Sequence, residues 1–141
     1  MTVITTPHLN FRGQARAALE FYHSVFGGQI VLVSNEDAFS AETPEEARQI
    51  KFGQVSGENG FQVMAYDVPA SISYDQGEKS LFVSVRGDSV DEITALWGGL
   101  VEGSTVLSDL APSQFSPAYG MLKDAFGVVW VLDVAVAYEP A

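Results

Sequence analysis

The chain has 141 residues, of which 47% are apolar and 18% are charged, a balance typical of one globular domain rather than of a disordered chain. Its formal net charge of −11 repels phosphate backbones and anionic lipid, so we expect neither nucleic acid nor a membrane as a partner. The absence of cysteine excludes disulfides, thiolate nucleophiles and cysteine-ligated metals.

The ends of the chain carry no visible targeting signal. Residues 1–7 lack the basic start and apolar run of a signal peptide. The longest apolar run, residues 128–137, contains Asp133 and is too short to cross a bilayer. We therefore expect a cytoplasmic protein that forms a single domain over residues 1–141.

Two segments have the apolar spacing of amphipathic helices. The first covers residues 15–26 and is followed by two glycines that can provide a left-handed cap. The second covers residues 90–101, and Ser89 and Glu92 have the spacing of a capping box at its start. Each helix presents one apolar face, which must pack against a sheet.

Short β-branched and aromatic runs bounded by Gly, Pro, Asn and Asp predict eight strands. Together with the helices they give the order βαβββ twice, in modules at residues 1–68 and 79–138. The expected strands are residues 6–12, 29–34, 49–55, 60–68, 79–85, 105–108, 117–123 and 127–135.

Matches between the two halves support an internal repeat. Phe-Arg-Gly at residues 11–13 matches Val-Arg-Gly at residues 85–87, an offset of 85 − 11 = 74. Gly60 matches Gly127, an offset of 127 − 60 = 67. The sequence therefore predicts an α+β fold of two βαβββ modules whose curved sheets form a cup, and a cup is the default place for a ligand.

Motifs spread over nearly the whole chain resemble one known family. The residues that carry the resemblance are Pro7–Gly13, Ala18–Tyr22, Val25–Gly28, Met64–Pro69, Ser80–Val85, Tyr119–Asp124 and Phe126–Trp130. Through them the chain resembles the PhnB-like branch, also called 3-demethylubiquinone 3-methyltransferase-like, of the vicinal oxygen chelate (glyoxalase/bleomycin-resistance/dioxygenase) superfamily. The resemblance implies the paired-module fold and a homodimer.

Superfamily enzymes resembling glyoxalase bind a divalent metal through His and Glu side chains that face the cup, and the metal stabilises an enediolate-like anion. His8 lies near one such position, and its counterpart in the second module is Ser80. The carboxylate positions hold Met64 and Val131. Such a site needs at least three suitable ligands, so we expect no family-type metal and no other cofactor.

Strand alternation selects the side chains that face the cup. His8 is the candidate catalytic residue, as a general acid or base with Asn10, Tyr66 or Ser80 orienting a substrate. The alternative is that His8 is a hydrogen-bonded residue of a pocket wall or of a subunit contact. The candidate ligand-binding residues are His8, Asn10, Gln62, Met64, Tyr66, Ser80, Phe82, Tyr119, Met121 and Val131.

Three functions follow from these observations. The first is a small-molecule-binding protein of the glyoxalase/bleomycin-resistance type, with a small apolar or aromatic ligand. The second is a metal-dependent lyase, isomerase or dioxygenase with a rearranged site. The third is a methyltransferase, as the name of the branch implies, although the sequence has no strand–G-x-G–helix unit for a nucleotide-like methyl donor.

Overall fold

A computed structural model describes residues 3–136 and divides the chain into two compact units, the first up to Gln76 and the second from Gly77. The first two and the last five residues lie outside the described part. The expected modules cover residues 1–68 and 79–138, so the start of the first module and the end of the second lie outside the described residues.

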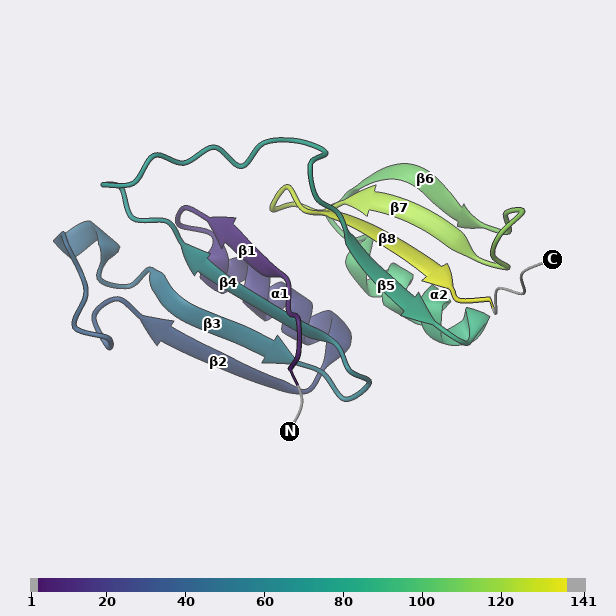
Figure 1. Cartoon of the computed structure of the whole chain (residues 1–141), viewed down its shortest axis with the longest axis horizontal. Helices are drawn as coiled ribbons and strands as arrows, with labels where there is room; N and C mark the ends of the chain where they lie inside the picture. Colours follow the sequence, from purple (N-terminus) through teal and green to yellow (C-terminus); the bar gives the residue numbers. More distant parts are fainter. Residues whose placement is uncertain (1–2, 137–141) are drawn as a thin grey trace. The chain divides into compact units, whose positions relative to one another are not determined.

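The first unit is a four-stranded mixed sheet with a helix on one face (Figure 1). The strands lie in the order β1-β4-β3-β2, with β1 parallel to β4 and the other pairs antiparallel. The sheet does not close on itself. Its elements are β1 (His8–Phe11), α1 (Ala15–Phe26), β2 (Gln29–Ser34), the 3-10 helix η1 (Pro44–Glu46), β3 (Ile50–Ser56) and β4 (Gln62–Asp67).

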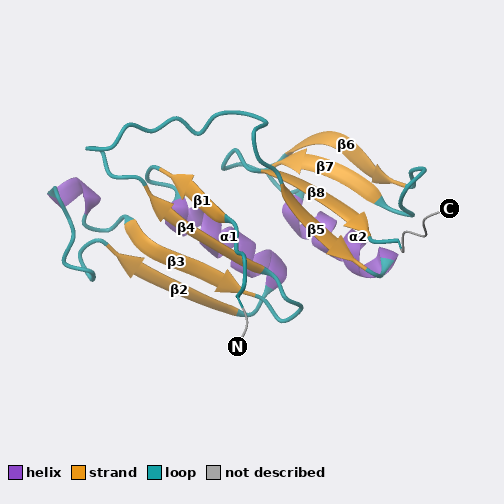
Figure 2. Cartoon of the chain, in the orientation of Figure 1, coloured by secondary structure: helices purple, strands orange, loops and turns teal. Residues whose placement is uncertain are grey.

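The second unit repeats this arrangement, again with the helix on one face of an open sheet (Figure 2). Its strand order is β5-β8-β7-β6, and β5 is parallel to β8. The two βαβββ modules of an α+β fold are therefore confirmed. The elements are β5 (Val83–Gly87), α2 (Val90–Leu100), β6 (Thr105–Ala111), β7 (Tyr119–Lys123) and β8 (Val129–Val134).

The core of the first unit lies between α1 and the sheet. The first two turns of the apolar stripe of α1 are fully buried there, as the helical spacing predicts, whereas Val25 and Phe26 at its end are half-buried. In β4, buried residues alternate with half-buried ones, so one side of the strand faces α1 and the other faces away. The helix-side residues include Phe11, Ala18, Leu19, Tyr22, Val63 and Ala65.

Asp67 joins three elements of the first unit at the end of β4. Its carboxylate is buried and accepts hydrogen bonds from the backbone N–H groups of Gly13 (2.7 Å), Ala15 (3.1 Å) and Ile50 (2.9 Å). Two of these groups belong to the turn and first residue of α1, where a negative charge also complements the helix dipole. Asp67 therefore fixes the path of the chain directly after β1.

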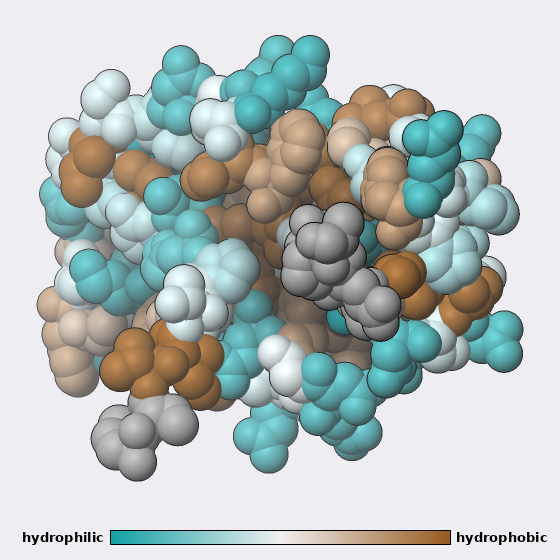
Figure 3. Space-filling model, turned by 45° about the vertical axis from the view of Figure 1, so that its right-hand side comes forward, coloured by the Kyte–Doolittle hydropathy of each residue, from teal (hydrophilic) through white to brown (hydrophobic). Residues whose placement is uncertain are grey.

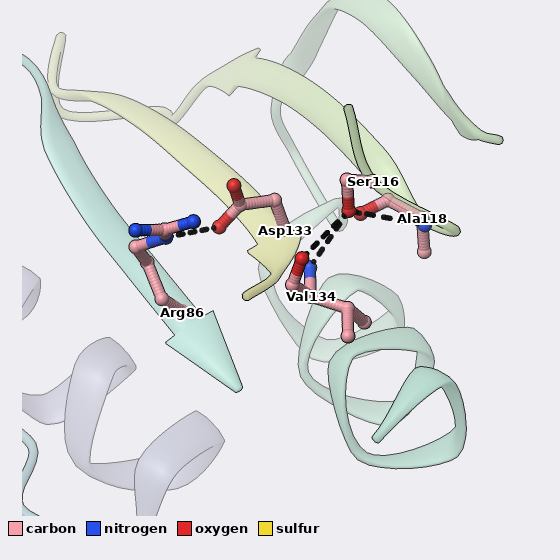
Figure 4. A network of polar contacts seen from close by, with 5 residues as sticks. All are labelled: Arg86, Ser116, Ala118, Asp133 and Val134. Carbon is pink, nitrogen blue, oxygen red and sulfur yellow. Dashed lines mark hydrogen bonds and ion pairs between the residues drawn. The ribbon is translucent and has the colours of Figure 1, made fainter. Parts of the chain in front are cut away.

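The core of the second unit is built around Trp130, which is fully buried. Its indole Nε1–H donates to the carboxylate of Asp124 at 2.9 Å. Asp124 also accepts from the backbone N–H groups of Phe126 and Val128, both at 2.9 Å, and so shapes the turn into β8. At the other end of β8, the buried Ser116 hydroxyl joins the chain before β7 to the backbone of Val134 (Figure 4).

The helix ends agree with the sequence patterns in part. Gly27 follows α1 with a φ of 71° and a ψ of −159°, so it has a positive φ but does not form the expected left-handed cap, and Gly28 has a φ of 83°. The side chain of Ser89 accepts a hydrogen bond from the backbone N–H of Glu92, as half of a capping box requires. Within residues 3–136, neither helix has the length and apolar character needed to cross a membrane.

The predicted strand at residues 79–85 is wrong in its start. The strand β5 begins at Val83, whose first ladder partner is Trp130. Ser80 and Phe82 precede it in an exposed loop. The apolar pair at residues 81–82 has strand propensity, but the ladder between β5 and β8 starts at the pair Val83–Trp130, so both residues stay outside it.

The register also corrects the repeat. His8 pairs with Met64 across β1 and β4, and Ser84 pairs with Val131 across β5 and β8. Because Met64 and Val131 differ by 131 − 64 = 67, as the sequence match gave, His8 corresponds to Ser84 at 84 − 8 = 76. The Phe-Arg-Gly match was two residues out, which leaves the facing of the strand unchanged. Ser80 is not the counterpart of His8.

Candidate functional site

Five candidate ligand-binding residues lie on one surface of the first unit. The register pairs His8 with Met64 and Asn10 with Tyr66, and places Gln62 on the same side of β4. This side faces away from α1, because the intervening residues of β4 are the buried ones. We call this surface the open face of the first unit. Their role in binding stays a prediction.

His8 is oriented by two neighbours on the open face. Its Nδ1 lies 3.0 Å from Oδ1 of Asn10, two residues along the same strand. Its ring also meets that of Tyr66 edge to face, with ring centroids 5.4 Å apart. Aromatic pairs favour this T-shaped geometry. The imidazole is thus held by a hydrogen bond and a ring contact, although the side chain is exposed.

Further amides extend the polar part of the open face. The Thr6 hydroxyl donates to Oε1 of Gln62 at 3.1 Å. Gln54 on β3 pairs with Met64 in the ladder and so lies on the same side, where its amide donates to the Ser56 hydroxyl at 3.0 Å. The face therefore combines thioether and aromatic surface with several groups that can donate or accept hydrogen bonds.

The loop after β4 is fastened against the end of β1. The Tyr74 hydroxyl donates to the backbone oxygen of Asn10 at 2.9 Å, and the Arg12 guanidinium lies 5.2 Å from the centre of the Tyr74 ring. Burial is the largest cause that raises the pKa of Tyr74 above its ordinary value. The positive charge of Arg12 lowers this pKa, whereas the negative charges of Asp67 and Asp75 raise it. Arg12 also donates to three loop carbonyls, those of Val68, Pro69 and Ile72.

The second unit has its own open face, on the side of its sheet away from α2. Tyr119 and Met121 of β7 and Val131 of β8 are half-buried there, in line with the sequence prediction. The ring of Phe115 meets that of Tyr119 edge to face at 4.9 Å. Ser80 is corrected here, because it lies three residues before β5 rather than on this face. The exposed Phe82 also precedes β5.

An ion pair on this second open face was not predicted. Nε of Arg86 lies 3.0 Å from Oδ1 of Asp133 (Figure 4). Asp133 also pairs with Tyr119 in the ladder, so a cation, a carboxylate and an aromatic ring occupy one row across three strands. The side chain of Arg86 is 56% exposed whereas that of Asp133 is 13% exposed. A pair this open to water contributes at most about 1 kcal/mol.

Other residues of the two faces were missed for different reasons. Gln54 could have been found from strand alternation, because it lies within the expected strand of residues 49–55. Ser84 needed the correct offset between the modules. Nothing in the sequence indicated that Tyr74, in a loop, would reach back to the backbone of Asn10.

The donor set does not fit a metal of the family type. The four positions related by register hold His8, Met64, Ser84 and Val131, so only one of them is a histidine and none is a carboxylate. Among residues 3–136, no group of three or more His, Cys, Asp or Glu side chains could hold a metal ion. No step of a mechanism is therefore assigned to a metal.

Apolar side chains reach the surface on both sheets. Val31 and Phe52, on the open face of the first unit, are 47% and 40% exposed. The space-filling view shows apolar surface in brown among polar side chains in teal on the side that it draws (Figure 3). Such exposed apolar area is common on proteins but is typical of binding surfaces when hydrogen-bonding groups border it.

The paired βαβββ modules are the fold of the vicinal oxygen chelate superfamily, and the comparisons place the chain in its PhnB-like branch. Residues 4–132 match the family described as 3-demethylubiquinone-9 3-methyltransferase. The chain therefore belongs to this family. The match covers most of the chain, in agreement with the motifs in its sequence.

Solved structures agree with this placement. Protein PA1353 from Pseudomonas aeruginosa is 29% identical, with a TM-score of 0.83 over 95% of this chain and 98% of that one. The putative 3-demethylubiquinone-9 3-methyltransferase, PhnB protein, from Bacillus cereus is 23% identical, with a TM-score of 0.72 over 94% and 100%. A glyoxalase/bleomycin resistance protein/dioxygenase family enzyme from Burkholderia phytofirmans PsJN is 14% identical and shows the fold alone, with a TM-score of 0.61 over 92% and 95%. No curated protein matches the chain.

Proposed function

We propose that this protein binds a small apolar or aromatic molecule against the open face of its first unit. The observation that carries the proposal is the register of β1 and β4, which brings His8, Asn10, Gln62, Met64 and Tyr66 onto one side of the sheet, away from α1. Ligand sites typically combine apolar surface with a few placed polar groups, and this face has both.

The chemistry of the face favours a flat ligand. Met64 supplies a flexible thioether and Tyr66 an aromatic ring, and both are half-buried. His8 and Asn10 supply hydrogen-bonding groups on the edge strand β1, and Gln62 supplies an amide on β4. A flat molecule with one polar group would cover the apolar atoms and leave its polar group beside His8.

The proposal also covers the oligomeric state and the metal content of the protein. We infer a homodimer without a family-type metal, since His8 is the sole histidine at the register-related positions and the family resemblance implies paired chains. If the site is also catalytic, His8 is the group suited to general acid–base chemistry. The competing function, a metal-dependent lyase, isomerase or dioxygenase, needs ligands that these positions lack.

The family's own description favours a third function, that of a methyltransferase. A methyl donor related to a nucleotide is usually held by a glycine-rich turn between a strand and a helix. In the first unit, β1 leads into α1 through a single glycine, Gly13, whose N–H is occupied by Asp67. We therefore rank methyl transfer below binding, and direct titration with S-adenosylmethionine tests it.

Native mass spectrometry of untagged protein, purified without chelator, tests the proposal. It reports the subunit count, any bound metal and any co-purified small molecule together. A metal-free dimer, above all one that carries an organic adduct, would support the proposal. A dimer with stoichiometric metal would contradict it and favour the lyase or dioxygenase function.

A further inference from the structure

We propose that Asn10 holds His8 in the tautomer that carries its proton on Nδ1, so that Nε2 is a hydrogen-bond acceptor. The ligand would then be one that donates a hydrogen bond, such as a phenol, an enol or an acidic N–H compound. The choice of ligand class rests on the function proposed above, whereas the tautomer can be tested without any ligand.

The assignment follows from the partner of each ring nitrogen. Nδ1 of His8 lies 3.0 Å from Oδ1 of Asn10, and an amide oxygen can only accept a hydrogen bond, so a proton must lie on Nδ1. A neutral imidazole has one proton, and the lone pair then lies on Nε2. Within residues 3–136, no hydrogen bond to Nε2 is formed.

Neighbouring contacts fix the backbone of Asn10 and the ring of His8. Asn10 pairs with Tyr66 in the parallel ladder, and its backbone oxygen accepts the Tyr74 hydroxyl at 2.9 Å. The Tyr66 ring meets the imidazole edge to face, which limits rotation of His8. Asn10 is therefore a positioning residue, and His8 is the residue that would touch the ligand.

An accepting Nε2 selects the chemistry of the ligand. A hydroxyl or acidic N–H can donate to it, whereas a ketone, an ether or an ester oxygen would face the lone pair without a proton to share. A polar site discriminates strongly against an analogue that leaves its hydrogen-bonding group unpaired. The open face would thus prefer a phenol to its methyl ether.

The second histidine of the chain provides an internal reference. Nε2 of His23 lies 3.0 Å from the backbone oxygen of Gly28, which can only accept, so His23 carries its proton on Nε2. The chain has two histidines, and the structure assigns them opposite tautomers. One spectrum therefore contains both the test and its reference.

Long-range ¹⁵N–¹H NMR of the intact protein at about pH 9, where an ordinary imidazole is neutral, distinguishes the tautomers. We expect the Nδ1–H pattern for His8 and the Nε2–H pattern for His23. In Asn10→Leu, His8 should change to the Nε2–H form that an unrestrained imidazole favours, whereas Tyr66→Phe should leave it unchanged. An Nε2–H form for His8 in the parent, or no change in Asn10→Leu, would overturn the inference.

A matched pair of probes tests the ligand class. 2-Naphthol should bind about three- to tenfold more tightly than 2-methoxynaphthalene to the parent, as one neutral hydrogen bond permits, and with equal affinity to Asn10→Leu. Equal affinities in the parent would overturn the assignment of a donating ligand. If neither probe binds while His8 shows the Nδ1–H form, the tautomer is supported and the proposed binding function is what fails.

Discussion

Replacing Asp67 by alanine should destabilise the first unit by several kcal/mol. The substitution leaves three backbone N–H groups without their acceptor, those of Gly13, Ala15 and Ile50. Those of Ala15 and Ile50 are buried, and each costs about 1–3 kcal/mol when unpaired, whereas the exposed Gly13 can turn to water. The loss is therefore about 2–6 kcal/mol, out of the 5–15 kcal/mol that typically stabilises a domain.

Urea unfolding followed by far-UV circular dichroism measures this change. Tryptophan emission comes only from Trp97 and Trp130 of the second unit, and so separates loss of the first unit from loss of the whole chain. Asp37→Ala is the matched control, because Asp37 is exposed in the same unit, and it should change the unfolding free energy by about 0.5 kcal/mol at most. A change that small in Asp67→Ala would refute the reasoning.

Three further outcomes are expected. Gly28→Ala should lower the melting temperature more than Gly60→Ala. Both glycines have a positive φ, but a Cβ at Gly28 would also collide with the Ser56 carbonyl oxygen, and equal shifts would contradict this reasoning. Burial raises the pKa of Tyr74 above its ordinary value of 10.0, so stability present below about pH 10 should fall as the pH rises further; absorbance titration of Tyr74→Phe should lack one phenolate step above about pH 10, and an unchanged curve would contradict this. Met64→Ala should weaken binding of an aromatic ligand several-fold while the melting temperature changes little, because Met64 is only half-buried; an unfolded variant would show that the residue is structural.

Local patterns predicted most of the fold because they report local physics. The helix of residues 15–26 has a clean apolar stripe and ends at glycines with positive φ, so spacing and capping indicated the same boundaries. Alternation in residues 62–67 likewise placed Met64 and Tyr66 on one side of β4. Side chains alternate between the two faces of a strand with a period of two residues. An error of two residues in the repeat offset therefore leaves the predicted face of each side chain unchanged.

Features set by distant partners were not accessible from the sequence. The start of β5 is set by its ladder with β8, which begins at the pair Val83–Trp130, and so Ser80 was assigned to a strand that it precedes. The contact of Tyr74 with Asn10 joins residues 64 apart, and no local pattern reports it. The same holds for the ion pair of Arg86 with Asp133.

The most direct test of the proposed site uses the methyl groups of methionine. The chain has three methionines, and ¹³C-methyl labelling of methionine and alanine gives each methionine its own NMR signal beside those of the alanines. Titration with an aromatic ligand such as 2-naphthol should shift the Met64 signal in a saturable way, while methyl signals of the buried, helix-side Ala18 and Ala65 stay in place. A saturable shift at Ala18 or Ala65 with none at Met64 would contradict the account.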